Sequence, residues 1–438
     1  MIPTLERFRR SGRLRALYGG IRAFVLGPPP ATSSAAARPE VVEDGVRELH
    51  RVTPTISQVD GYRLNLLIPT VAPAGAFGGI RTALDLFEAI APAAPARRIV
   101  SMAALPADAA SVLPGYRPTP GAEDSTEPAQ LVSIDPATDP TLAVGPRDVF
   151  VATFWSTAEL ADRLRRWQAT TFGHMPDRWA YVIQDHEPGF YPKSAHSELA
   201  RATYLRPEST VAIFNTSLLQ GAFHARGLRF DREFAFEPRI PEPLRATLAV
   251  PPGPRDRTIV VYGRPRTPRN AFPAIVDGLR AWRAGDPEAA TWSVVSAGMP
   301  HPDIDLGDGV WLRSVGKLDL VEYAQLLRRS AIGISLMISP HPSYPPIEMA
   351  HLGLLVLTNS HENKDLSSWH SNIASTDDLS ADGLAERLSE LCRRFDAEPG
   401  SGDLGVSSVP EYLSDGPQFP FAAEVSALLR PDAAVGPR

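Results

Sequence analysis

Four consecutive polar side chains stand at the end of one strongly apolar segment. Gln184, Asp185, His186 and Glu187 directly follow WAYVI, and a Pro-Gly pair then turns the chain. A carboxylate or an imidazole in this setting can take a proton from an attacking hydroxyl group or hold sugar hydroxyls. We therefore expect Asp185, His186 and Glu187 to be catalytic and Gln184 to contact an acceptor; a polar loop without chemistry is the alternative. Position 190 is Phe, so the HExxH pattern of zinc proteases is absent.

Basic residues follow two other apolar segments. Tyr262 and Arg264 flank a glycine after TIVV, and Lys317 follows a glycine ahead of the helical pattern VEYAQLLRR. Each charge-assisted hydrogen bond from such a group to a diphosphate would contribute about 1.5–3 kcal/mol. Only Lys193, Lys317 and Lys364 among the 44 basic residues are lysines, which suggests that a compact ammonium is needed at these positions. The alternatives are that the three lysines were retained by chance, that Arg264 is only solvated, and that the turn at Lys317 is an ordinary one.

Two glycine- or proline-rich turns predict helix starts that could face an anion. The segment 339–353, SPHPSYPPIEMAHLG, places Ser343 and Tyr344 before two prolines that suit a first helical turn. Glu348 in that turn could accept both hydroxyls of a ribose, or it could only complement the helix dipole. Gly79, in a Gly-Gly-Ile turn between a strand and a helix, lets the backbone approach a ligand. Neither GxGxxG followed by an acid nor GxxxxGK[ST] occurs, which disfavours nicotinamide dehydrogenases and P-loop NTPases.

The elements that must position these residues alternate between short apolar runs and longer helical patterns. From about residue 60, RLNLLIPT, DVFVATFW, WAYVIQD and TVAIFNTS predict strands, with helices such as GGIRTALDLFEAIA and TAELADRLRRWQ between them. The same alternation restarts at TIVVYGRP, after a segment at 232–256 that is rich in proline and charge and predicts a linker. We predict an α/β protein with two Rossmann-like, doubly wound domains facing a central cleft, where such folds bind ligands.

The predicted organisation has four parts. They are a basic N-terminal arm and linker (1–48), an N-terminal domain (49–245), a C-terminal domain (246–400), and a tail (401–438) whose helix FPFAAEVSALLR returns toward the N-terminal domain. The arm interleaves arginines with leucine, isoleucine and phenylalanine at roughly helical spacing, so it either packs on the protein's own surface or contacts an anionic membrane peripherally.

Composition excludes several classes of protein. The 438 residues, 43% of them hydrophobic and 21% charged, are enough for two or three folded domains. A net charge of -6 gives no general attraction for nucleic acid. A single cysteine excludes internal disulfides, and no run of 18 uncharged apolar residues occurs. We therefore expect a cytoplasmic protein, with peripheral contact at the inner face of the cell membrane if the arm binds lipid.

Several motifs together resemble a known family. YGRP, a GKL turn and SPHPSYPPIEMAHLG look like a GT-B glycosyltransferase of the family-four type. QDHEPGFYPKS and SYPPIEMAHLGLLVLTNSHENKDLS are similar more narrowly to WsaF-like rhamnosyltransferases of bacterial cell-surface glycan synthesis. The resemblance covers roughly residues 60–430.

The resemblance implies a nucleotide-sugar donor of the dTDP-L-rhamnose type, bound mainly by the C-terminal domain. The acceptor would be a glycan or lipid-linked glycan, bound by the N-terminal domain. Arg264 and Lys317 would hold the diphosphate and Glu348 the nucleoside sugar. The remaining residues expected in the donor site are Gly79, Tyr262, Ser343, Tyr344 and Lys364, and those expected at the acceptor are Gln184 and Lys193.

One departure from the family pattern concerns the transferred sugar. Many family-four enzymes carry a glutamate eight residues before the position of Glu348, where this chain has Pro340, so sugar identity and stereochemistry stay open. The nearest acidic pair, Asp303 and Asp305, does not end a strand facing the cleft, so we expect transfer without a metal or other cofactor. A catalytically inactive nucleotide-sugar-binding scaffold is the main alternative; the motifs disfavour a phosphorylase or an epimerase.

Overall fold

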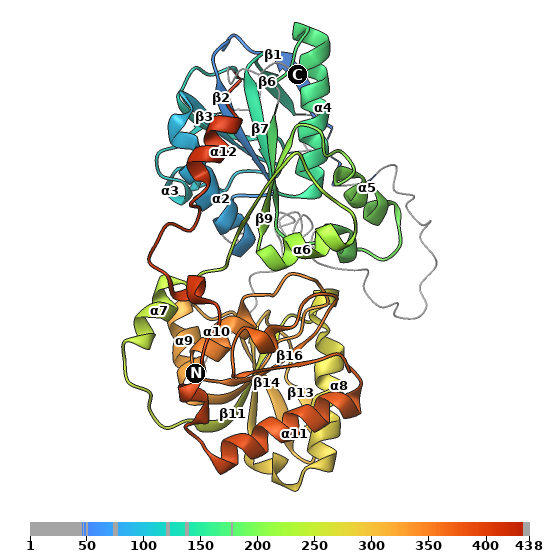
Figure 1. The fold of residues 1–438 in the computed structure, drawn as a ribbon, viewed down its shortest axis with the longest axis vertical. Helices are drawn as coiled ribbons and strands as arrows, with labels where there is room; N and C mark the ends of the chain where they lie inside the picture. The colour runs from blue at the N-terminus through green and yellow to red at the C-terminus, as the bar shows by residue number, and fades with distance from the viewer. Residues whose placement is uncertain are drawn as a thin grey trace, which may run out of the picture.

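The computed structural model describes residues 46, 48–49, 51–72, 78–119, 123–135, 140–176 and 178–431. They form two α/β domains, one above the other in Figure 1. The basic arm lies almost entirely outside the described residues, so its membrane contact stays a prediction. Within the described ranges, no helix combines the length and the apolar character needed to cross a bilayer.

The N-terminal domain is built on an eight-stranded sheet with the order β10-β9-β8-β7-β2-β3-β5-β4, in which every pairing is parallel. Its central strands are buried on both faces, as expected for a parallel sheet between two helical layers. The strands are β2 (Arg63–Ile68), β3 (Ala96–Ser101), β4 (Arg117–Thr119), β5 (Ala129–Ser133), β7 (Asp148–Ala152), β8 (Trp179–Ile183), β9 (Thr210–Asn215) and β10 (Arg232–Phe236).

Helices cover both faces of this sheet. Alternate residues of β8 point to opposite faces, so Tyr181 packs with α4 (Trp155–Phe172) and α6 (Ser217–Ala225), while Val182 packs with α2 (Gly78–Ile90). Shorter helices are α3 (Ala109–Val112) and α5 (Ala195–Thr203). A separate parallel pair, β1 (Thr53–Ile56) with β6 (Thr141–Val144), lies beside the main sheet and has no counterpart in the sequence prediction.

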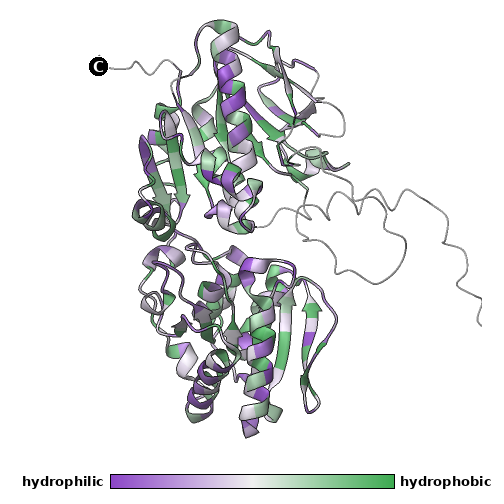
Figure 2. Ribbon diagram, turned by 90° about the vertical axis from the view of Figure 1, so that its right-hand side faces the viewer, coloured by the Kyte–Doolittle hydropathy of each residue, from purple (hydrophilic) through white to green (hydrophobic). Residues whose placement is uncertain are grey.

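The C-terminal domain is built on a seven-stranded sheet with the order β13-β14-β12-β11-β15-β16-β17, parallel except for the edge pair β13 and β14. The strands are β11 (Asp256–Gly263), β12 (Ser293–Gly298), β13 (Ile304–Gly307), β14 (Val310–Gly316), β15 (Ser330–Ile334), β16 (Leu355–Asn359) and β17 (Ile373–Thr376). One face packs on α8 (Phe272–Gly285) and α11 (Ala381–Ala397), and the other on α7 (Glu242–Leu248), α9 (Leu320–Arg329) and α10 (Pro345–His351). In Figure 2 the strands of both sheets are mainly hydrophobic, while the helices carry hydrophilic stretches.

Two doubly wound parallel sheets confirm the predicted fold class. The linker predicted over 232–256 is wrong in part, because Arg232–Phe236 forms edge strand β10 and Glu242–Leu248 forms helix α7. The charged residues of β10 are tolerated because an edge strand keeps one side open to water. Helix α12 (Ala422–Leu428) buries Val425 in the N-terminal domain's core, beside α2.

Candidate active site

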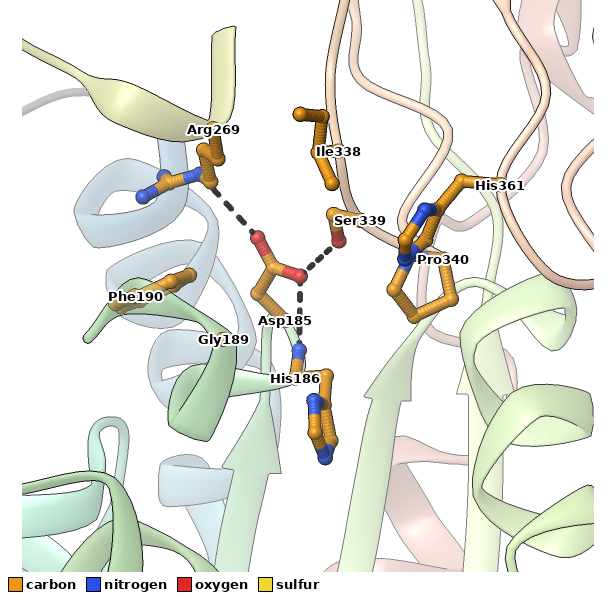
Figure 3. A pocket seen from close by; sticks show the side chains of 9 residues that line it. All are labelled: Asp185, His186, Gly189, Phe190, Arg269, Ile338, Ser339, Pro340 and His361. Atoms are coloured by element: carbon orange, nitrogen blue, oxygen red, sulfur yellow. Dashed lines mark hydrogen bonds and ion pairs between the residues drawn. The ribbon is translucent and has the colours of Figure 1, made fainter. Parts of the chain in front are cut away.

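A small pocket lies where the two domains meet. Figure 3 shows side chains from both domains converging on it. The N-terminal domain contributes the segment after β8, and the C-terminal domain contributes the turn η4 (Pro268–Asn270) and the segments after β15 and β16. The lining residues are Asp185, His186, Gly189, Phe190, Arg269, Ile338, Ser339, Pro340 and His361.

Asp185 is the acidic residue that lines this pocket. It is only 5% exposed, and its Oδ1 accepts hydrogen bonds from the backbone N–H of His186, at 2.8 Å, and from the hydroxyl of Ser339. Its Oδ2 lies 3.6 Å from Nε of Arg269, whose guanidinium stacks 4.1 Å from the ring centre of Phe190. A carboxylate held in this way at a strand end can accept a proton from a hydroxyl group in the pocket.

His186 lines the pocket as a neutral imidazole. Burial, reinforced by the positive charge of Arg226, lowers its pKa from 6.5 to about 4. Its ring lies 5.8 Å from that of Phe223 and 6.2 Å from that of Tyr204, centre to centre. A neutral imidazole can donate and accept hydrogen bonds, so His186 can hold a hydroxyl group at physiological pH.

Glu187, expected to be catalytic, has its side chain among core residues and outside the pocket lining. Its carboxylate is 1% exposed and accepts hydrogen bonds from the backbone N–H of Trp155, at 2.6 Å, and from the hydroxyl of Tyr181, at 3.2 Å. Trp155 is the first residue of α4, so Glu187 satisfies a free N–H group at a helix start. Burial raises the pKa of Glu187 well above its usual value. We assign it a structural role.

The two residues expected at the acceptor lie in different surroundings. Gln184 lies against the start of α2, where a Cβ at position 79 would come within 2.3 Å of its Oε1, so Gly79 is what allows this approach. Lys193 is exposed in the loop before α5 and does not line the pocket. The structure therefore brings Gln184 and Gly79 together and leaves Lys193 apart from them.

The basic residues expected at the diphosphate lie at the carboxyl ends of β11 and β14, outside the lining of the pocket. Arg264 donates a hydrogen bond of 3.1 Å to the hydroxyl of Tyr262, which fixes the guanidinium over the end of β11. Lys317 directly follows β14 and is exposed. Of the nearby acids, Asp303 accepts a hydrogen bond from Ser314 N–H and Asp305 from Gly307 N–H, both at 2.9 Å, so each serves the β13–β14 hairpin.

The segment before α10 joins the domains. The hydroxyl of Tyr344 lies 2.8 Å from Nδ2 and 3.1 Å from Oδ1 of Asn215, at the end of β9, and its ring lies 3.5 Å from a Cβ built on Gly78. Ser343 is buried with a φ of 67°, and its N–H donates to Nδ1 of His341 at 3.0 Å. A strained φ at a non-glycine residue persists only where neighbouring contacts hold it.

Glu348 is half-buried in the first turn of α10. Burial raises its pKa from 4.5 to about 7, opposed by a hydrogen bond with Tyr323. The group therefore exchanges between its neutral and charged forms near neutral pH. Either form can accept hydrogen bonds from sugar hydroxyls, and the charged form accepts them more strongly.

Lys364, expected in the donor site, lies inside the C-terminal domain and outside the pocket lining. It is 1% exposed, and its ammonium donates to the backbone carbonyl of Met337. Burial lowers its pKa from 10.5 to about 8, while the charge of Asp185 opposes the shift. The buried ammonium of Lys364 therefore holds the loop that follows β15 through its hydrogen bond to Met337.

Sequence reasoning did not single out Ser339, His341, Arg269 or His361 as site residues. Ser339 and His341 lie inside the quoted SPHPSYPP motif, so the motif itself was the available signal. His341 is 7% exposed, and burial lowers its pKa to about 4. His361 lies inside the other quoted motif, SYPPIEMAHLGLLVLTNSHENKDLS, whereas Arg269 lies in no quoted motif and joins the pocket only in the folded chain.

Two family models match most of the folded chain. The model of the WsaF N-terminal domain matches residues 63–217, and that of the WsaF C-terminal domain matches residues 257–389. The chain belongs to the WsaF family. The predicted resemblance to WsaF-like GT-B glycosyltransferases is thereby confirmed.

A curated relative and two solved structures are similar to this WsaF-family chain. O-antigen biosynthesis protein RfbC of Myxococcus xanthus is 30% identical over 181 residues, which are 41% of this chain and only 14% of that protein. A UDP-forming α,α-trehalose-phosphate synthase from Burkholderia xenovorans, in complex with glucose-6-phosphate, has a TM-score of 0.50 at 12% identity, covering 84% of this chain and all of the other. WaaG, a glycosyltransferase involved in lipopolysaccharide biosynthesis, has a TM-score of 0.47 at 11% identity, covering 84% and 99%.

Proposed function

We propose that this WsaF-family chain is a glycosyltransferase that moves L-rhamnose from dTDP-L-rhamnose to a hydroxyl group of a growing cell-surface glycan. The observation that carries the proposal is the buried Asp185 carboxylate, held at the end of β8 in a pocket shared by both domains. Family membership and the similarity to RfbC, an O-antigen biosynthesis protein, support the substrate class.

Asp185 is the proposed general base. The acceptor oxygen attacks C1 of the sugar as its proton passes to Asp185, and the bond from C1 to the diphosphate oxygen breaks with its electron pair on that oxygen. A single displacement of this kind inverts the anomeric centre. We therefore expect a product of configuration opposite to the donor, which NMR of the anomeric proton and carbon would show.

The leaving diphosphate is the proposed ligand of Arg264 and Lys317. Each lies at the carboxyl end of a strand of the second sheet, the edge at which doubly wound domains bind nucleotides. Two cations placed there would stabilise the charge that develops as the diphosphate departs. Glu348, near the start of α10, is the proposed partner of the ribose hydroxyls.

We further propose that transfer needs no metal, because arginine and lysine supply the charge. The positions of Asp303 and Asp305 support this, because each accepts a hydrogen bond from a backbone N–H group of its own hairpin. Activity should persist in EDTA. Loss of activity on chelation that manganese restores would overturn metal independence and leave the rest of the proposal standing.

The donor is tested first by thermal shift with dTDP, UDP, GDP and ADP, because a ligand that binds only the folded state raises the Tm. A shift with dTDP alone supports the donor assignment, and transfer from dTDP-L-rhamnose to a glycan acceptor then tests the reaction. Preference for UDP or GDP would retain the fold and overturn the rhamnose donor. No shift with any nucleotide would count against the whole proposal.

A second candidate is a catalytically inactive nucleotide-sugar-binding scaffold. Pro340 lines the pocket at the position where many family-four enzymes place a glutamate, which favours this candidate. A chain that binds dTDP but transfers no sugar to any glycan acceptor would support it over the enzyme.

A further inference from the structure

Ser339 reaches Asp185 from the opposite domain. It belongs to the segment after β15 of the C-terminal domain, it is 4% exposed, and its hydroxyl donates a hydrogen bond to Oδ1 of Asp185 (Figure 3). The same hydroxyl oxygen accepts a hydrogen bond of 3.0 Å from the N–H of His341, which leaves its proton directed at the carboxylate.

The two oxygens of Asp185 are held differently. Oδ1 accepts from both Ser339 and the N–H of His186, whereas Oδ2 has Arg269 at 3.6 Å, beyond hydrogen-bond distance. Two donors on one oxygen fix the plane of the carboxylate. The other oxygen is thereby the one with lone pairs available to an incoming hydroxyl proton.

The segment that carries Ser339 is fixed to the C-terminal domain. Asn359, at the end of β16, accepts a 2.6 Å hydrogen bond from Met337 N–H, and its side-chain amide donates back to the Met337 carbonyl at 3.1 Å. The N–H of Ile338 donates to the carbonyl of Arg269 at 2.7 Å, and Lys364 donates to the Met337 carbonyl. Ser339 must therefore move with the C-terminal domain.

We propose that Ser339 is a positioning residue that the C-terminal domain supplies to Asp185, so that the base is correctly oriented only when the two domains are closed. The inference rests on the proposed glycosyltransferase function and adds a condition to it. Proton removal from the acceptor is coupled to closure over the donor, which keeps an open enzyme from activating a hydroxyl group too early.

The test compares Ser339→Ala with Ser339→Thr and Ser335→Ala, using the full chain and dTDP-L-rhamnose. Ser335 is the matched control, because it is a buried serine in the same segment whose hydroxyl has no hydrogen-bond partner among the described residues. Loss of a hydrogen bond to a charged group should lower kcat about 10- to 100-fold in Ser339→Ala. Acceptor KM and the Kd of dTDP should change less than about twofold, Ser339→Thr should recover most of kcat, and Ser335→Ala should match the wild type.

A double-mutant cycle with Asp185→Asn separates positioning from a structural role. If Ser339 acts through Asp185, Ser339→Ala should cost nothing more in the Asp185→Asn background. An equal loss in both backgrounds, or a Ser339→Ala variant with wild-type kcat, would overturn the inference while the function stands. A wild-type chain that transfers no sugar would overturn the function and the inference together. Should the alanine variant not fold, Ser339→Cys, a weaker donor of similar size, replaces it.

Discussion

The ends of strands β8 and β14 each carry residues with a proposed part in one reaction, yet they differ in how firmly the protein holds them. After β8, Asp185 and Glu187 are both buried and hydrogen-bonded. At the end of β14, Val315 and the following Lys317 are exposed. The side proposed to remove the proton is therefore buried and hydrogen-bonded, whereas the side proposed to bind the phosphates carries an exposed lysine. Proton transfer needs fixed geometry, and a point charge tolerates more freedom.

The largest expected effect is at the β8 end. Asp185→Asn should lower kcat about 100- to 10,000-fold, because the amide retains the volume and can still accept from Ser339 but cannot take a proton. Steady-state kinetics with dTDP-L-rhamnose measures the loss, and the Kd of dTDP should be unchanged.

Glu187→Gln is the comparison variant, since it changes a second buried carboxylate two residues away. We expect it to keep kcat within about threefold, because its oxygen can still accept from Trp155 N–H. A loss in Glu187→Gln as large as that in Asp185→Asn would return Glu187 to the catalytic residues and contradict the assignment made from its burial.

A smaller effect is expected at the β14 end. Lys317→Ala should remove about 2–3 kcal/mol of transition-state stabilisation, which is roughly a 30- to 150-fold loss in kcat/KM. Lys193→Ala is the matched control, because Lys193 is also exposed but lies in the N-terminal domain, in the loop before α5. Equal kinetics for Lys317→Ala and the wild type would remove Lys317 from the site.

Most of the fold could be predicted because buried parallel strands are short, continuous apolar runs. WAYVI and RLNLLI became β8 and β2 at the expected places. Strand β10 was missed because Arg232 and Glu233 make it resemble a linker, and an edge strand tolerates such residues. The pair β1 with β6 joins segments more than 80 residues apart, so local pattern gave no sign of it.

The sequence predicts only those parts of the site that lie directly at the ends of strands. The sequence placed Asp185 and the SPHPSYPP motif at two sheet edges, but it contained nothing to show that Ser339 would meet Asp185 across the domain interface. It grouped Glu187 with Asp185 by adjacency, whereas the turn η3 (Glu187–Phe190) directs Glu187 to the start of α4. Lysine side chains are rarely buried, so the sequence gave no sign that Lys364 would be buried with its ammonium on the carbonyl of Met337.

The smallest expected effect is on the free energy of unfolding, and it concerns the buried β8 end. Near the β8 end, burial lowers the pKa of His341 from 6.5 to about 4. Between pH 6.5 and pH 4, His341 is therefore protonated in the unfolded chain and neutral in the folded chain. The free energy of unfolding is therefore highest above about pH 6.5 and falls as the pH drops toward 4. One such group lowers it by about 2 kcal/mol at pH 5.

Urea unfolding at pH 7.5 and pH 5 should show a smaller acid-induced loss of stability in His341→Gln than in the wild type. His174→Gln, which changes an exposed histidine, should keep the wild-type loss. Equal acid-induced losses in His341→Gln and the wild type would show that the folded chain accommodates a charged His341, and the β8 end would then be less rigidly closed than its contacts indicate.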